Sequence, residues 1–167
     1  ISQHADSMGA PSACEARNVP NVSYNGSTID SCPNTFLVSS RIDWEPYFEY
    51  IINCVAKGET IAADWTGTLA TGSVVLTDIN EAVAAKGTKE AVEAAKKDLE
   101  AGTLKVFDTS KFTVNGETLT EYLADVDDMG DFVPETNAIS DGYFHESEYR
   151  SAPYFTIEID GITRLDK

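Results

Sequence analysis

The segment VPNVSYNGST, residues 19–28, decides how the first half of the chain folds. A short apolar run leads into Asn25-Gly26, and Asn-Gly between two strands is the strongest short signal for a β-hairpin. Here, however, the mainly polar residues 27–35 separate the pair from the next apolar run at Phe36, which is too long a connection for a two-residue hairpin. We therefore predict that Asn25-Gly26 ends a parallel strand, at the sheet edge where ligands bind in α/β proteins.

Helical and strand patterns alternate on both sides of this segment. Residues 11–18 predict a short helix with proline near its start, and residues 36–40 predict a buried strand. In residues 45–58, EPYFEYIINCVAKG, apolar and aromatic side chains recur at helical spacing, and Lys57-Gly58 predicts the end of that helix. We expect its aromatic stripe to be core rather than a ligand platform. The alternation predicts an α/β fold with a parallel sheet and flanking helices.

The middle of the chain continues this pattern. We predict a strand over residues 72–76, a short helix over residues 79–86, and a strand over residues 103–108. Between the last two, Thr88 is expected to cap a helix that ends before Gly102.

The last third of the sequence changes in character. Hairpins are predicted around Asn115-Gly116 and around Asp160-Gly161, with an acidic, aromatic-rich stretch between them. The predicted organisation is therefore an α/β portion over residues 1–107 and a β-rich extension of hairpins and loops over residues 108–167, packed on the first part.

Composition limits the possible functions. The net charge of −16, from 28 acidic and 12 basic residues, disfavours nucleic acid and anionic lipid as partners, because like charges repel. No apolar stretch is long enough to span a membrane. Cys14, Cys32 and Cys54 include no Cys-x-x-Cys pair, which disfavours zinc, and a Cys32–Cys54 bridge is an option only in an oxidising compartment.

Two clusters resemble catalytic or metal sites without completing them. Asp125, Asp127, Asp128 and Asp131 surround Gly130, but Met129 stands where a calcium loop requires an oxygen ligand, and Thr136 stands where it requires a bidentate Glu. A solvated acidic loop is therefore the better interpretation. His145 lies beside Glu146 and Glu148, yet no known nucleophile motif accompanies it. We expect neither a catalytic centre, nor a metal, nor a cofactor.

Polar and aromatic side chains gather at the predicted strand ends. If residues 1–24 form strand, helix and strand, the loops that begin at Gln3 and Tyr24 lie side by side at the carboxyl edge of the sheet, and the loop after residue 40 joins them. Such a composition suits a polar, cyclic small molecule. The alternative is that Asn25-Gly26 is only a turn, Asp6 a helix cap and Trp44 core. The candidate ligand-binding residues are His4, Asp6, Tyr24, Asn25, Arg41 and Trp44.

Several stretches together carry a family resemblance. They are ISQHADS, ACEARNVPNVSYNGS, FLVSSRIDWEPYFEYIINCVAKGE, DWTGTLATGSVVLTDINEAV, LKVFDTSKFTVNGETL and SDGYFHESEYRSAPYFTIEIDGI, which cover nearly the whole chain in order. In this order they resemble the later part of the basic membrane protein (BMP) family, bacterial substrate-binding lipoproteins of ABC transporters. The resemblance implies a partial lobe of the type I periplasmic-binding-protein fold, whose ligand lies between two lobes. This chain would be a fragment that lacks the N-terminal lobe.

The resemblance also implies where the ligand is held. It places contacts at His4 or Asp6, at Asn25 and at Trp44. Nucleoside and sugar binders often carry Asp at the position of Asn25, and an amide lacks the two-oxygen grip of a carboxylate on sugar hydroxyls. Trp44 is a stacking residue rather than a hydrogen-bonding one.

These observations predict a non-enzymatic function. The resemblance implies a solute-binding component of a bacterial ABC importer, which takes a nucleoside-like or sugar-like molecule, delivers it to an ABC permease, and is lipid-anchored at the extracellular face of the membrane or in the periplasm. One alternative is a surface adhesion or interaction module that uses the acidic extension. Another is a hydrolase that uses Asp6 with His4, or the region of His145.

Overall fold

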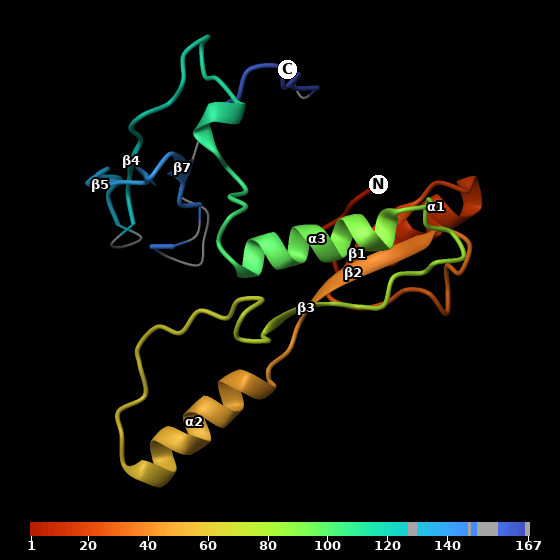
Figure 1. The fold of residues 1–167 in the computed structure, drawn as a ribbon, viewed down its shortest axis with the longest axis horizontal. Coiled ribbons are helices and arrows are strands. Elements are labelled where there is room, and N and C mark those ends of the chain that lie inside the picture. The colour runs from red at the N-terminus through yellow and green to blue at the C-terminus, as the bar shows by residue number, and fades with distance from the viewer. Residues whose placement is uncertain (127–129, 147, 150–156, 166–167) are drawn as a thin grey trace. The chain divides into compact units, whose positions relative to one another are not determined.

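The computed structural model describes residues 1–126, 130–146, 148–149 and 157–165 (Figure 1). It divides into two compact units, Ile1–Thr103 (unit 1) and Leu104–Lys167 (unit 2). Within the described residues, no helix is both long enough and apolar enough to cross a lipid bilayer.

Unit 1 contains three α-helices and one sheet. Along the chain its elements are α1 (Gly9–Arg17), β1 (Asn21–Tyr24), β2 (Phe36–Ile42), α2 (Glu45–Lys57), β3 (Val74–Leu76) and α3 (Thr88–Glu100). Among its described residues, unit 2 contains the 3-10 helix η1 (Thr109–Lys111) and four short strands, β4 (Leu123–Ala124), β5 (Thr136–Asn137), β6 (Ile139–Ser140) and β7 (Tyr143–Phe144).

The sheet of unit 1 confirms the parallel arrangement predicted around Asn25. β1 and β2 are parallel, with Val22 opposite Val38 and Tyr24 opposite Ser40. A parallel bridge from Ser2 to Val22 adds the start of the chain to the other side of β1. Asn25-Gly26 therefore ends a parallel strand and is not a hairpin turn.

The prediction of a parallel sheet is confirmed for β1 and β2 but not for β3. β3 runs antiparallel to β2, with Ile42 opposite Val74 and Ser40 opposite Leu76, so the sheet is mixed in the order β1-β2-β3. The connection from β2 to β3 does contain a helix, α2, but the chain returns to the edge where β2 ends, and Asp43 N donates to Ser73 O (2.8 Å) just before β3 begins.

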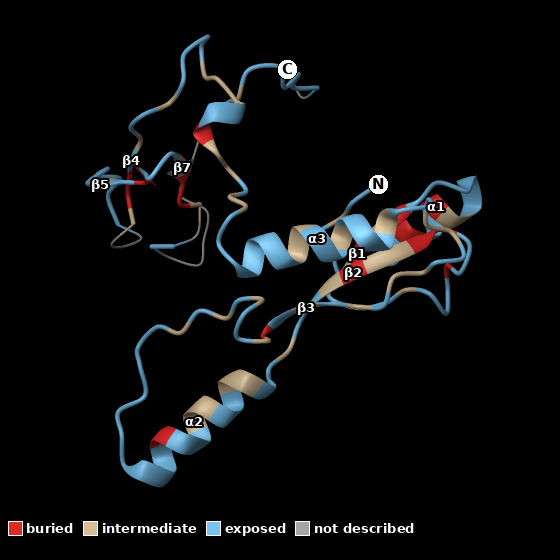
Figure 2. Ribbon diagram, in the orientation of Figure 1, coloured by how far each residue is buried: buried red, intermediate tan, exposed pale blue. Residues whose placement is uncertain are grey.

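Most buried residues of unit 1 lie in α1, β1, β2 and the loops between them, while Figure 2 also shows buried residues on α2 and next to β3. Phe36, with 1 % of its surface exposed, is the largest of them, and Cys14 and Cys32 are also buried. The sheet itself buries polar side chains that bond to each other: Ser23 donates to Asn21 Oδ1 (2.7 Å), and Asn21 Nδ2 donates to Gln3 Oε1 (3.1 Å). These bonds offset the cost of removing polar groups from water.

A carboxylate fastens α1 to the loop before β2. Glu15 Oε2 accepts from the hydroxyl of Thr35 (2.7 Å), and Glu15 Oε1 accepts from the backbone and side-chain nitrogens of Asn34 (3.2 and 2.5 Å). Desolvation alone would raise the pKa of Glu15, but the hydrogen bonds from Thr35 and Asn34 outweigh it, so this pKa lies below its ordinary value.

Helix α2 is present as predicted, but its apolar residues are divided between two faces. Pro46 lies in its first turn, and Gly58 ends it at φ 69°. Tyr47 and Tyr50 pack on Trp65, with ring centroids 5.2 and 6.3 Å apart. The exposed stripe of α2 is Trp44, Phe48, Ile52 and Val55. Tyr47 and Tyr50 are only half-buried, and Cys54 is the one buried residue of α2, so the aromatic stripe does not form the core that the sequence predicts.

Three local predictions in the middle of the chain are wrong. Residues 79–86 form turns rather than a helix, because Asn80 Oδ1 accepts from Ala82 N (3.2 Å) while Asn80 Nδ2 donates to Pro33 O (3.1 Å). α3 is preceded by Gly87 at φ 88°, and no side chain, Thr88 included, caps it. Residues 103–108 form no strand, and only Asp108 makes a β-bridge, to Tyr143.

Unit 2 has its own small core. Buried Ala124, Ala138, Ile139 and Phe144 pack against Phe107, Leu119, Tyr122, Val126 and Ile157. The sequence placed the start of the extension at residue 108, whereas the chain divides after Thr103.

The two predicted hairpins of unit 2 differ in outcome. The one at Asn115-Gly116 is present in minimal form, as a Val114–Glu117 bridge with both turn residues at positive φ. Around Asp160-Gly161 the described residues form a turn without paired strands. Asp160 instead reaches that first turn: it accepts from Thr113 Oγ1 (2.6 Å), Gly116 N (2.7 Å) and Asn115 N (3.0 Å).

Candidate functional site

A polar groove lies in unit 1 at the carboxyl ends of the first two parallel segments. Its volume is about 190 Å³, and one wall comes from the loop that follows Ser2, the other from the loop that follows β1. The lining residues are Gln3, Ala5, Asp6, Ser7, Met8, Tyr24, Asn25, Gly26, Ser27 and Thr28.

Backbone pairing fixes the first wall against β1. Val22 N donates to Ile1 O (2.8 Å), and Gln3 N donates to Val22 O (3.2 Å), which is the alternation of a parallel ladder. The Gln3 side-chain amide stabilises the loop that follows, because its Nε2 donates to Ala5 O (3.1 Å) and to Ser7 O (3.4 Å). The residues of this loop are therefore positioned by the sheet and by one side chain.

An aromatic contact joins the two walls. The rings of His4 and Tyr24 are stacked, with centroids 4.4 Å apart and planes at 24°. Asp6 lies exposed in the groove lining beyond this pair. The groove lining therefore includes a carboxylate, from Asp6, and an aromatic ring, from Tyr24.

Asn25 has a backbone conformation that presents its side chain at the rim. It adopts φ 62°, a left-handed conformation that asparagine tolerates better than most residues. Its backbone N donates to Ser40 O (2.7 Å), and Gly26 N donates to Ser39 Oγ (3.2 Å). In the described part of the chain, the Asn25 side-chain amide makes no hydrogen bond, so its donors and acceptor are open to a ligand.

Three of the six sequence-predicted residues do not line the groove: His4, which stacks on the lining residue Tyr24, and Arg41 and Trp44. Arg41 pairs with Asp43 (Nη1 to Oδ2, 3.3 Å), and Asp43 also accepts from Glu45 N at the start of α2. Trp44 has 56 % of its surface exposed and packs against Tyr47 and Phe48 of its own helix. Neither Arg41 nor Trp44 lines the groove.

Sequence reasoning did not single out several groove residues. Gln3, Ser7, Ser27 and Thr28 contribute amide and hydroxyl groups to the lining, and Thr28 Oγ1 lies 2.9 Å from Ser23 Oγ. The available signal was their position in the same two loops as Asp6 and Asn25. The groove is thus richer in neutral hydrogen-bonding groups than predicted.

The groove contains no recognisable metal site. Among the described residues, no group of three or more His, Cys, Asp or Glu side chains is placed to hold a metal ion. In the acidic cluster of unit 2, Asp125 and Asp131 are described, while Asp127 and Asp128 lie outside the described residues. All three cysteines are free thiols and buried, with no Cys32–Cys54 bridge.

A second polar cluster lies in unit 2, at the β6–β7 hairpin. Ser140 Oγ is 2.7 Å from His145 Nε2, and His145 Nδ1 contacts the carboxylate of Glu148. Sequence analysis considered His145 and Glu148 but missed Ser140. The signal was Asp141-Gly142, a turn dipeptide that folds Ser140 back toward the residues after β7.

Neither the protein-family models nor the curated proteins compared with the chain give a match. The function is therefore argued from the geometry of the groove.

Proposed function

We propose that unit 1 carries part of the binding site of a bacterial solute-binding lipoprotein of the BMP type. In this proposal the groove between residues 3–8 and 24–28 takes a nucleoside-like or sugar-like molecule. A second lobe of the type I periplasmic-binding-protein fold closes over it, and the loaded protein delivers the solute to an ABC permease at the outer face of the membrane. Closure is a shift between open and closed populations that the solute stabilises, and no bond is made or broken.

One observation carries this proposal. The Ser2–Val22 bridge and the parallel pairing of β1 with β2 bring two loops to one carboxyl edge, where a groove of about 190 Å³ lies between them. Carboxyl edges of parallel strands are the usual ligand positions in α/β proteins, because successive loops meet there.

The chemistry of the lining agrees with an uncharged, hydroxyl-bearing solute. Asp6 accepts hydrogen bonds, the Asn25 amide both donates and accepts, and Ser7, Ser27 and Thr28 add hydroxyls. Tyr24, on which His4 stacks, adds an aromatic ring to the lining that can contact a base or a sugar ring.

The proposal is tested by titrating the 167-residue chain with a purine nucleoside, a pyrimidine nucleoside and a simple sugar while amide NMR signals are recorded. One class is expected to shift the signals of residues 3–8 and 24–28 in a saturable way and to raise the unfolding temperature. If all three classes leave these signals unmoved at millimolar concentration, the groove is not the site.

Substitutions in and beside the groove test which side chains bind the solute. Asn25→Gly removes the amide while glycine keeps φ 62° without strain, so it is expected to weaken binding without destabilising the sheet. Asn25→Asp supplies a second acceptor oxygen and is expected to favour a solute with two adjacent hydroxyls. Arg41→Ala is the matched control, because Arg41 lies outside the groove lining. An equal loss in Asn25→Gly and Arg41→Ala would contradict the assignment.

A further inference from the structure

Ser140, His145 and Glu148 of unit 2 form a continuous hydrogen-bonded chain. His145 Nε2 lies 2.7 Å from Ser140 Oγ, and His145 Nδ1 lies against the Glu148 carboxylate. Since a carboxylate only accepts, this geometry suits the neutral tautomer with its proton on Nδ1, which leaves the Nε2 lone pair for the serine hydroxyl. A nucleophile, a base within reach, and a third group that orients the base are the parts of an activated serine.

The imidazole is held in place on several sides. Only 6 % of His145 is exposed, and its ring centroid lies 3.9 Å from that of Tyr143. Its backbone N donates to Ala138 O (2.9 Å), so the residue is fixed next to β6. Lys105 Nζ lies over the Tyr143 ring, 4.3 Å from its centroid, and so packs on the ring that contacts His145. Ser140 itself is exposed and accessible to a solute.

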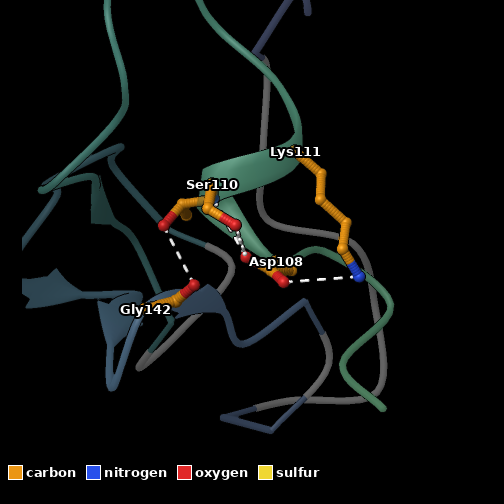
Figure 3. Close-up of polar contacts among 5 residues, drawn as sticks. Asp108, Ser110, Lys111 and Gly142 are labelled. Carbon is orange, nitrogen blue, oxygen red and sulfur yellow. Dashed lines mark hydrogen bonds and ion pairs between the residues drawn. The ribbon is translucent and has the colours of Figure 1, made fainter.

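The turn beside Ser140 is anchored to η1. Gly142 O accepts from both the backbone N and the hydroxyl of Thr109, each at 2.9 Å. Figure 3 shows Gly142 next to η1, where Asp108 binds Ser110 and Lys111. Within the described residues, the backbone N–H groups of Asp141 and Gly142 donate to no acceptor. Ser140 is therefore followed directly by an anchored turn whose two backbone N–H groups are available as hydrogen-bond donors.

We propose that Ser140 is a nucleophile toward small acyl esters, with His145 as its base and Glu148 as the residue that positions His145. Because Ser140 lies on an open surface rather than in a deep pocket, the substrates are short, activated esters. This activity belongs to unit 2 and is independent of solute binding in unit 1.

The reaction proceeds in two balanced steps. Ser140 Oγ attacks the ester carbonyl carbon while its proton moves to His145 Nε2, the bond to the leaving oxygen breaks, and that oxygen takes the proton from Nε2. Water then attacks the acyl-serine and gives its proton through Nε2 back to Ser140 Oγ. One ester and one water become one carboxylic acid and one alcohol.

The test is covalent labelling of the whole chain with a fluorophosphonate, in which phosphorus bonds to the nucleophilic oxygen and fluoride leaves. Peptide mass mapping is expected to place the label on Ser140. Labelling is expected to vanish in Ser140→Ala and to slow about 100-fold in His145→Gln. Ser110→Ala, which removes another exposed hydroxyl of unit 2, is the matched control and should label at the normal rate. Absence of label from Ser140 in the unaltered chain would overturn the proposal without reference to any variant.

The positioning role of Glu148 needs its own readout. A far-downfield proton NMR signal from His145 Nδ1–H is expected in the unaltered chain and in Ser140→Ala, and is expected to disappear in Glu148→Gln together with a slower labelling rate. Unchanged labelling in Glu148→Gln would remove Glu148 from the proposal.

Discussion

His4 and Tyr24 stack face to face, with ring centroids 4.4 Å apart, and so connect two loops that are separated by α1 in the sequence. An aromatic pair adds about 0.5–1.5 kcal/mol beyond its buried area, and an exposed pair lies at the low end. We expect His4→Ala to lower the free energy of unfolding by about 0.5 kcal/mol, and to move the amide signals of residues 5–8. His4→Phe keeps a ring and should restore both, and urea unfolding with amide NMR measures the difference.

Asp160 makes the Asn115-Gly116 turn sensitive to acid. Hydrogen bonds from Thr113, then from the Gly116 and Asn115 amides, keep the pKa of Asp160 below its ordinary value. The stabilisation is therefore complete above the pKa of the unfolded chain and is lost as the pH falls through the lower, folded value. Asp160→Asn is expected to loosen this turn at neutral pH and to remove its response to acid. Exposed Asp131→Asn is the control, and the Gly116 amide signal followed against pH is the measurement.

Glu15 is expected to give unit 1 a similar acid dependence. Its pKa is lowered by Thr35 and Asn34 against the opposing effect of desolvation, so its contribution is present at neutral pH and disappears on acidification through the folded pKa. Glu15→Gln should reduce the stability of unit 1 and flatten its pH profile between neutral and acidic buffer. If urea unfolding of this variant keeps the original pH dependence, the contact with Thr35 is not what stabilises the loop.

The exposed stripe of α2 predicts an adhesive surface. Ile52 and Val55 expose 65 % and 69 % of their surface, and Trp44 and Phe48 continue the same stripe. We expect Ile52→Lys to reduce binding of a hydrophobic dye and self-association, and to change the free energy of unfolding by less than about 0.5 kcal/mol. Cys54→Lys, on the buried side of the same helix, should destabilise the chain markedly. Equal destabilisation by both variants would contradict the two-faced description.

The three thiols should react slowly in the folded chain. Cys14, Cys32 and Cys54 are buried, and burial, followed by the charges of Glu15 and Cys14, raises the pKa of the Cys32 thiol. A thiol reagent is expected to modify all three only after denaturation, without prior reduction. Fewer than three reactive thiols in denaturant would indicate a disulfide.

The sequence correctly predicted those elements whose start and end signals lie in neighbouring residues. Asn25-Gly26 was correctly interpreted because residues 27–35 exclude a tight hairpin, and α2 because Pro46 and Gly58 mark its two ends. Two loops therefore could be placed at one edge of the sheet from sequence alone. The antiparallel direction of β3 could not be predicted, because nothing in its three residues indicates which way the strand runs.

The errors occurred where contacts between distant residues overrule local preference. Asn80 bonds to Pro33, which lies far back in the sequence, and this contact keeps residues 79–86 in turns. Arg41 was expected in the groove, but its guanidinium forms an ion pair with the Asp43 carboxylate instead. Ser140 meets His145 only because the Asp141-Gly142 turn forms and Thr109 anchors it, and no spacing rule for catalytic motifs contains that geometry.

The hydrogen bond from Gly26 N to Ser39 Oγ also bears on chemical ageing. Deamidation of an Asn-Gly pair begins when the glycine nitrogen attacks the asparagine side-chain carbonyl, and here that nitrogen is held by β2. Asn25 would therefore convert to Asp or isoaspartate mainly when the end of β1 opens. The rate at which Asn25 gains mass in stored protein therefore reports how often the end of β1 opens. Each conversion leaves a new negative charge at the rim of the groove.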